Sequence, residues 1–338
     1  MKRVVLTICA AAALLSGCNE IEMGDDVANQ IKFGMPSARA EVHSADEILE
    51  FKVYAEMNLS PDNAEDGSNL QWVPLLEGER VYRANGESDF TYDNTRYWVN
   101  DRTFYFYGVY PATTNVTRYG LDSDQDGTND GWAYNSTIEV PLAADVDYMT
   151  AIYSQGITNN AFPASVSMSF THNMARVRFK VKKAETNKDD TFTVTEIGFS
   201  GISRMGNLTL RYAPGQTYAP TFTVNSEKGT VNRRNLNVSV ETDGTELFTD
   251  NGLLLIPQEI AAGQAKLNIS FKFQQEEDVN GEAIENQTIA KDLPAITWEP
   301  NKTYVYTLEL RDDKNIYIST PTVEGWGTPQ PGGFIIIQ

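Results

Sequence analysis

Short runs in which apolar and polar residues alternate dominate the sequence. In the clearest run the apolar residues are separated by basic ones at every second position: Ala175, Arg176, Val177, Arg178, Phe179, Lys180, Val181, Lys182. A period of two places one set of side chains in a core and the other in water. This run therefore predicts a strand that is buried on one face.

The same alternation recurs along the chain. It predicts further strands with these inward-facing residues: Leu49/Phe51/Val53/Ala55, Phe104/Phe106, Leu208/Leu210/Tyr212, Leu236/Val238/Val240, Leu267/Ile269/Phe271/Phe273 and Tyr304/Tyr306/Leu308/Leu310. Clusters of Gly, Asn, Asp and Pro separate these runs, as turn residues do. Many short strands without helical patterns between them favour antiparallel sandwiches over a parallel sheet. The predicted fold class is all-β.

The length of 338 residues suits about two domains, at about 100–200 residues each. The polar segment 154–160 precedes a fresh series of strands that begins at Val166. We therefore expect one β-sandwich domain over residues 40–160 and a second over residues 161–338.

The first residues carry the pattern of an export signal. Met1-Lys2-Arg3 is basic, Val4 to Leu15 is apolar, and Leu15-Ser16-Gly17-Cys18 resembles the lipobox of bacterial lipoproteins. The apolar run is shorter than the ~20 residues that span a bilayer. The resemblance implies a signal peptide over residues 1–17 and a lipid on Cys18; the alternative is an ordinary signal peptide with an incidental cysteine.

Composition excludes several classes of partner. With 46 acidic against 27 basic residues, the net charge of −19 leaves no basic field for nucleic acid or an anionic membrane surface. Two Cys and two His are too few for a disulfide framework or a Cys/His zinc site.

Sequence motifs of catalysis are not found. The chain has no Gly-rich phosphate loop after a strand, no Gly-x-Ser-x-Gly and no His-Glu-x-x-His. His172 shares the parity of Val166, Met168 and Phe170, which predicts a structural, core-facing histidine, and His43 is expected to be solvated. We predict no enzymatic activity and no certain cofactor.

One acidic loop has the spacing of a calcium site. Asp122, Asp124 and Asp126 occupy positions one, three and five, Gly127 follows, and Asp130 stands at position nine. That spacing collects carboxylates around Ca²⁺, although Ala133 replaces the usual glutamate at position twelve. Two interpretations stay open: a calcium loop that stiffens an exported protein, and a solvated acidic loop.

The C-terminus ends in an apolar tip. Gly332-Gly333 precedes Phe334, Ile335, Ile336, Ile337 and Gln338. An unpaired apolar strand is an aggregation hazard, so we expect this segment to be covered. It either serves as a donor strand for another subunit or docks as the last edge strand on its own sheet.

Together these features resemble the fimbrillin family, the lipoprotein-derived type V pilins of Gram-negative anaerobes. The matching fragments run along the chain in order: Cys18; Ile31-Lys32-Phe33 followed by Ala38-Arg39-Ala40; Phe51 to Ala55; Phe104 to Pro111; Phe170 to Val177; Pro300 to Tyr306; and Val323 to Trp326.

The resemblance implies two tandem transthyretin-like antiparallel β-sandwich domains in a precursor that reaches the outer membrane as a lipoprotein. It also implies a proteolytic cut after Arg39, which removes residues 18–39 with the first strand, Ile31 to Met35. Lys32 is the poorer cleavage site because it lies within that strand. A neighbouring subunit's terminal strand, with Phe334, Ile335, Ile336 and Ile337, would then fill the opened groove and build a cell-surface fimbria that supports adhesion.

Two alternatives come from other functional classes. One is a tip or accessory adhesin in which the Asp122 loop and an exposed Trp132 bind a host protein or glycan. The other is a lipid-anchored surface lipoprotein that binds glycans and never polymerises. Retention of lipid on Cys18 in the mature protein would favour anchoring, whereas a mature N-terminus at Ala40 would favour assembly.

Overall fold

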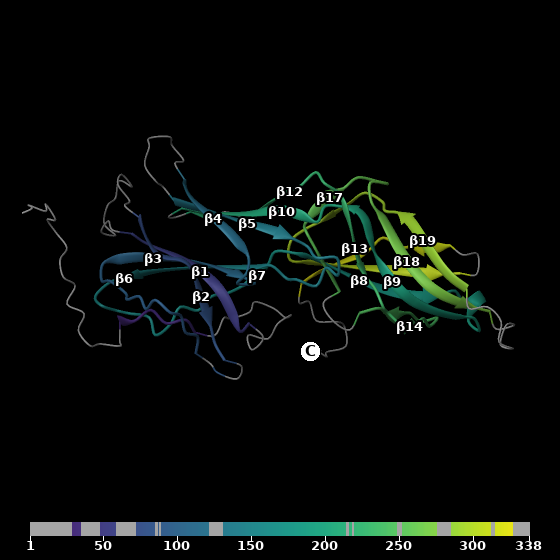
Figure 1. Cartoon of the computed structure of the whole chain (residues 1–338), viewed down its shortest axis with the longest axis horizontal. Helices are drawn as coiled ribbons and strands as arrows, with labels where there is room; N and C mark the ends of the chain where they lie inside the picture. The colour runs from purple at the N-terminus through teal and green to yellow at the C-terminus, as the bar shows by residue number, and fades with distance from the viewer. Residues whose placement is uncertain are drawn as a thin grey trace, which may run out of the picture.

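The computed structural model describes residues 29–34, 48–58, 72–84, 87, 89–121, 131–213, 216–217, 220–248, 252–275, 285–311 and 315–326. Over these ranges the chain consists of strands and loops, with the short 3₁₀ helix η2 (Glu185–Asn187) and no α-helix. The predicted all-β class is therefore confirmed. Figure 1 shows an elongated molecule with β1, β2, β3 and β6 toward one end of its long axis and β9, β18 and β19 toward the other.

The first sheet has the strand order β2-β1-β3-β6-β7 and is antiparallel throughout. Its strands are β1 (Glu50–Asn58), β2 (Trp72–Tyr82), β3 (Arg102–Tyr110), β6 (Met149–Ile157) and β7 (Thr171–His172). Phe51, Val53 and Ala55 of β1 are fully buried on one face, as their alternation predicts. They belong to a hydrophobic cluster that also includes Phe104 and Phe106 of β3.

A second antiparallel sheet joins strands from both sides of residue 160. Its order is β11-β10-β5-β4, with β12 also paired to β10. The strands are β4 (Asn115–Leu121), β5 (Gly131–Glu139), β10 (Met205–Ala213), β11 (Gln216–Thr217) and β12 (Thr221–Val224). The division of the chain into residues 40–160 and 161–338 stays a prediction, and any such boundary has to accommodate the β5–β10 pairing.

The remaining strands form two larger sheets and one small one. The first has the order β13-β9-β18-β19 with β14 also on β9, and comprises β9 (Thr191–Ile202), β13 (Gly229–Arg233), β14 (Val238–Ser239), β18 (Lys266–Gln274) and β19 (Glu285–Asp292). The second large sheet has the order β15-β8-β21-β22, with β16 also paired to β8 and β23 also paired to β21. Its strands are β8 (Ala175–Lys183), β15 (Thr245–Glu246), β16 (Leu253–Leu255), β21 (Lys302–Leu310), β22 (Ile316–Ile318) and β23 (Thr322–Gly325). The small sheet pairs β17 (Gln258–Ile260) with β20 (Ile296–Trp298).

One strand pair departs from the antiparallel expectation. β8 and β21 run parallel, with Lys302 opposite Ala175 and Leu310 opposite Lys183. A parallel pair requires a long crossover, and here 118 residues, 184–301, separate the two strands. Each of these strands has antiparallel neighbours on its other side.

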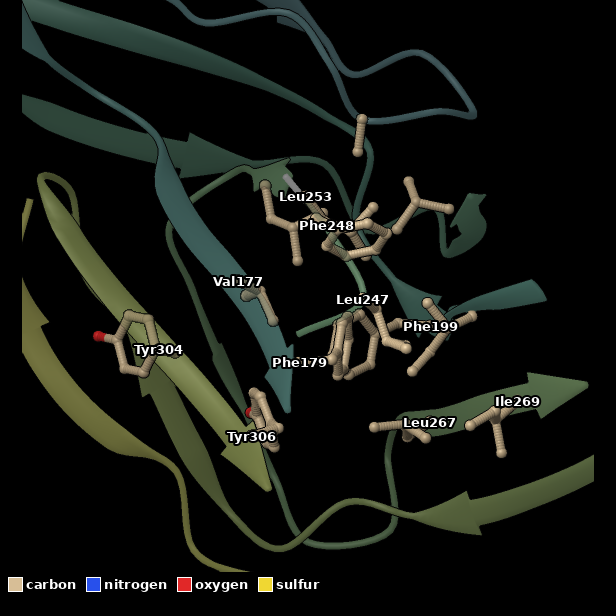
Figure 2. Packing of buried hydrophobic residues seen from close by; sticks show 14 of the residues in the cluster. Val177, Phe179, Phe199, Leu247, Phe248, Leu253, Leu267, Ile269, Tyr304 and Tyr306 are labelled. Carbon is tan, nitrogen blue, oxygen red and sulfur yellow. The ribbon is translucent and has the colours of Figure 1, made fainter. Parts of the chain in front are cut away.

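The largest core lies between these sheets. Val177, Phe179 and Val181 of β8 are completely buried, while the basic residues between them are only partly so, which confirms the predicted alternation. The Phe179 ring lies 5.6 Å from Phe199 and 6.0 Å from Tyr306. Figure 2 shows Val177 and Phe179 extending from β8 toward this aromatic and aliphatic cluster.

The alternation fails at the start of β1. Leu49 was expected on the buried face, but it is exposed, and Ile48 is buried in its place. The reason is that β1 begins only at Glu50, so Leu49 does not follow the pleat of the strand. In β3, Tyr107 and Val109 are buried as well, because a small cluster with Tyr134 and Leu210 covers the second face of the sheet.

Candidate functional site: an N-terminal segment held in a groove

Residues 29–34, here called the N-terminal segment, are inserted into the first hydrophobic cluster. Ile31 and Phe33 are buried, at 0% and 2% exposure, whereas Lys32 between them is exposed. The segment therefore follows the period of a strand, as Ile31-Lys32-Phe33 predicts. It contributes two side chains to the core.

Aromatic rings enclose Phe33. Its ring packs edge-to-face against Tyr92 at 5.4 Å and against Phe51 and Phe106 at 6.0 Å each. Edge-to-face pairs at such distances are favourable beyond the burial of their area. The Tyr92 hydroxyl donates a hydrogen bond of 2.8 Å to the Ile31 carbonyl, so Tyr92 contacts both Ile31 and Phe33.

Backbone groups hold the segment along both edges. On one edge Ile31 N–H donates to the Arg96 carbonyl at 2.8 Å, and Trp98 N–H donates to the Asn29 carbonyl at 2.7 Å. On the other edge Val166 N–H donates to the Lys32 carbonyl at 2.6 Å, and Gly34 N–H donates to the Val166 carbonyl at 3.0 Å. The segment is thus an interior strand in its bonding.

Removing the N-terminal segment would open a groove in its place. The backbones of residues 90–98 and Val166 would form the edges of this groove, and the rings of Phe51, Tyr92 and Phe106 would line its interior. Emptying it would expose apolar rings and leave paired backbone groups without partners. A chain in that state would strongly favour binding another extended apolar segment. This groove cannot be predicted from the sequence, because residues 90–98 lack a regular alternation of apolar and polar residues.

A buried ionic cluster joins the first two sheets. Glu56 of β1 is fully buried and accepts hydrogen bonds from Arg118 of β4, at 3.0 Å, and from the Tyr134 hydroxyl of β5. Burial raises the pKa of Glu56 from 4.5 to about 7, while Tyr134 and Arg118 act in the opposite direction. Arg118 also pairs with Glu77 at 2.9 Å. Glu56 was missed at the sequence level because one acid in a strand is usually solvated.

His172 is buried, as its parity predicts. Its Nδ1 lies 2.6 Å from Oδ2 of Asp147, and its ring stacks on Trp326 at 4.3 Å. The guanidinium of Arg176 lies 5.0 Å from the centre of the same indole. These contacts fix the last described residue of the chain against β7 and β8.

A family model described as fimbrillin-like matches residues 46–326. The chain belongs to the fimbrillin-like family. The match covers most of the sequence and confirms the resemblance that the ordered fragments indicate. No curated protein matches the chain.

A solved structure agrees with this fold. A fimbrial protein from Bacteroides vulgatus ATCC 8482 has a TM-score of 0.58 at 20% sequence identity, covering 88% of this chain and 100% of that chain. A fimbrial assembly protein from Parabacteroides distasonis ATCC 8503 has a TM-score of 0.35 at 11% identity, with coverage of 88% and 97%. At 20% identity, the similarity to the Bacteroides vulgatus protein concerns the fold alone.

The residues that the sequence singles out for processing, assembly and metal binding lie outside the described residues. They are Cys18, Arg39, the four aspartates Asp122, Asp124, Asp126 and Asp130, and the tail residues Phe334, Ile335, Ile336 and Ile337. His43 lies there as well. Their roles stay predictions. Of the predicted first strand, Ile31 to Met35, the structure describes residues 31–34, which belong to the N-terminal segment, and Met35 lies outside the described residues.

Trp132, which the adhesin alternative treats as exposed, is partly buried under the guanidinium of Arg118, at 4.6 Å from the ring centre. Arg118 belongs to β4, which pairs with β5, so its guanidinium lies over the indole. Across the described part of the chain, no group of three or more His, Cys, Asp or Glu residues could hold a metal ion. In the same part, no helix is long and apolar enough to cross a membrane.

Proposed function

We propose that this fimbrillin-like protein is a structural subunit of a cell-surface fimbria, assembled by removal of its first strand and strand addition between copies. The precursor is exported and acylated at Cys18, carried to the outer membrane, and cut after Arg39. The cut releases the N-terminal segment, and the C-terminal strand of a neighbouring subunit, Phe334 to Ile337, takes its place.

One observation carries the proposal. The N-terminal segment is bonded along both edges and buries Ile31 and Phe33, yet it lies at the chain's N-terminal side of Arg39. A strand in that position can leave after a single cut without threading the chain through the fold. The opened groove would offer main-chain donors and acceptors with side-chain pockets between them, which are the elements of strand addition.

Two cleavage-site variants test the processing step. Arg39→Ala should stop release of the segment and block polymer formation. Lys32→Ala is the matched control: its side chain is exposed within the segment, and polymer formation should be unchanged. N-terminal sequencing of surface protein should give Ala40. A mature protein that keeps lipid on Cys18 would contradict the proposal and favour the anchored glycan-binding alternative.

A truncation tests the donor role. Deleting residues 334–338 removes the apolar tip without touching the groove. We expect processed monomers that do not polymerise. Normal fibres from the truncated subunit would refute the donor-strand role and favour docking of the tip on its own sheet.

A further inference from the structure

The groove presents its binding positions in a fixed order. Ile31 fills the position beside Arg96, and Phe33 fills the ring-lined position beside Phe90 and Val166. The next residue is Gly34, where a Cβ atom would lie 2.6 Å from Oγ of Ser165. Along the segment, the groove thus takes isoleucine, an outward residue, phenylalanine and glycine.

The C-terminal tail contains the same series in reverse. Gly333, Phe334, Ile335 and Ile336 read glycine, phenylalanine, one intervening residue and isoleucine. Phe334 is the one aromatic residue of the sequence after Trp326. Residues two apart in a strand share a face, so Phe334 and Ile336 can point into the groove together.

We propose that the tail of a neighbouring copy enters the groove in the direction opposite to the N-terminal segment. Phe334 then occupies the position of Phe33, Ile336 that of Ile31, and Gly333 that of Gly34. This inference rests on the proposed function and specifies the direction and register of the incoming strand.

Entry in the same direction as the N-terminal segment fits the groove less well. In a tail that ran like the N-terminal segment, Phe334 at the position of Phe33 would leave Gly332 at the position of Ile31 and that pocket empty. The register that fills both pockets with isoleucine uses Ile335 and Ile337. An isoleucine would then lie among the three rings and forgo their edge-to-face contacts, and Gln338 would bring a Cβ toward Ser165. Backbone pairing does not oppose reversal, because parallel and antiparallel ladders both satisfy N–H and C=O groups.

Disulfide mapping distinguishes the two directions, and the chain suits it. Both cysteines, Cys9 and Cys18, precede the predicted cut after Arg39, so the processed protein contains none. Gln30 pairs with Tyr97, and the reversed register puts Ile337 at the place of Gln30. Tyr97→Cys with Ile337→Cys is therefore the reversed-direction pair. Neighbouring strands lie about 4.7–4.9 Å apart, which is within disulfide range for Cα atoms.

The matched pair reports the other direction. Phe33 forms an antiparallel bridge with Phe90, and extending that bridge by one residue puts residue 34 opposite Asp89. The same-direction register puts Gln338 at residue 34. Asp89→Cys with Gln338→Cys is that pair. Tyr97 and Asp89 are both exposed, so neither substitution removes a core side chain.

Each full-length double variant is processed by a protease that cuts after arginine, polymerised, oxidised and run on a non-reducing gel. We expect a ladder of covalent oligomers, lost on reduction, from the Tyr97/Ile337 pair and only monomer from the Asp89/Gln338 pair. A ladder from the Asp89/Gln338 pair alone, or polymer with no ladder from either pair, would overturn the proposed direction and register while leaving strand exchange intact. Absence of polymer from the processed unsubstituted protein would overturn the proposed function itself.

Discussion

Glu56 makes the stability of this protein depend on pH in an unusual direction. Its carboxyl group is buried between the first two sheets, and burial raises its pKa from 4.5 to about 7. The folded chain therefore binds this proton more tightly than the unfolded chain does. The stabilisation is fully present below about pH 4.5 and is lost as the pH rises through 7.

The size of the effect follows from the two pKa values. One pKa unit corresponds to about 1.4 kcal/mol, so a shift from 4.5 to about 7 is about 3.4 kcal/mol in all. About 2.5 kcal/mol of this stabilisation is lost between about pH 5 and pH 8. Glu56→Gln removes the titration but keeps an amide oxygen for Arg118, and the Tyr134 hydroxyl can accept a hydrogen bond from the amide nitrogen.

Denaturant unfolding at pH 5 and pH 8 measures this contribution. We expect the unfolding free energy of the unsubstituted protein to fall by about 2.5 kcal/mol more than that of Glu56→Gln, since other titrating groups cancel in the comparison. Glu77→Gln is the control. Glu77 pairs with the same arginine but is 69% exposed, and its charge is the smallest of the influences on the pKa of Glu56, so the pH profile of this variant should stay close to that of the unsubstituted protein. Equal profiles for all three proteins would show that Arg118 and Tyr134 offset the burial of Glu56 completely.

Three further changes test other parts of the structure. Phe33→Ala should lower the unfolding free energy of the uncut precursor by about 3–5 kcal/mol in denaturant unfolding, because Phe33 is 2% exposed among three rings. Lys32→Ala should change that free energy by less than about 0.5 kcal/mol. Equal effects of the two substitutions would show that the burial of Phe33 does not stabilise the precursor. Gly198→Ala should lower the thermal midpoint, because its Cβ would lie 2.1 Å from the Val231 carbonyl oxygen of β13; an unchanged midpoint would mean that β13 can move away. If the Asp122 loop binds calcium, the thermal unfolding midpoint should be higher with calcium than with a chelator. An unchanged midpoint would show that the loop is not a calcium site.

Strong local patterns were the predictable part of this fold. The basic-apolar alternation of β8 and the inward residues of β18 and β21 hold in the structure, because a single period sets which side chains are buried. Leu49 failed because the pattern does not say where a strand begins. Residue Glu56 could not be found this way, since its partners Arg118 and Tyr134 lie 62 and 78 positions away.

The same limit applies to the candidate site. Ile31-Lys32-Phe33 is recognisable as a short strand, but its backbone partners are residues 90–98 and Val166. The β5–β10 pairing likewise crosses the polar segment that suggested a boundary. Local sequence therefore indicates the strands, whereas their neighbours depend on contacts between distant residues.

On the proposed mechanism, the cut after Arg39 decides which strand occupies the groove. Before the cut, the 13 residues 35–47 tether the N-terminal segment to the fold, so its effective concentration at the groove is about millimolar, and an external tail competes poorly. The incoming phenylalanine and isoleucine replace side chains of the same kind, so better packing cannot drive the exchange. After the cut the segment is part of a separate peptide, and its departure is no longer opposed by the tether. Cleavage of one peptide bond therefore makes the exchange of the N-terminal segment for the incoming tail favourable.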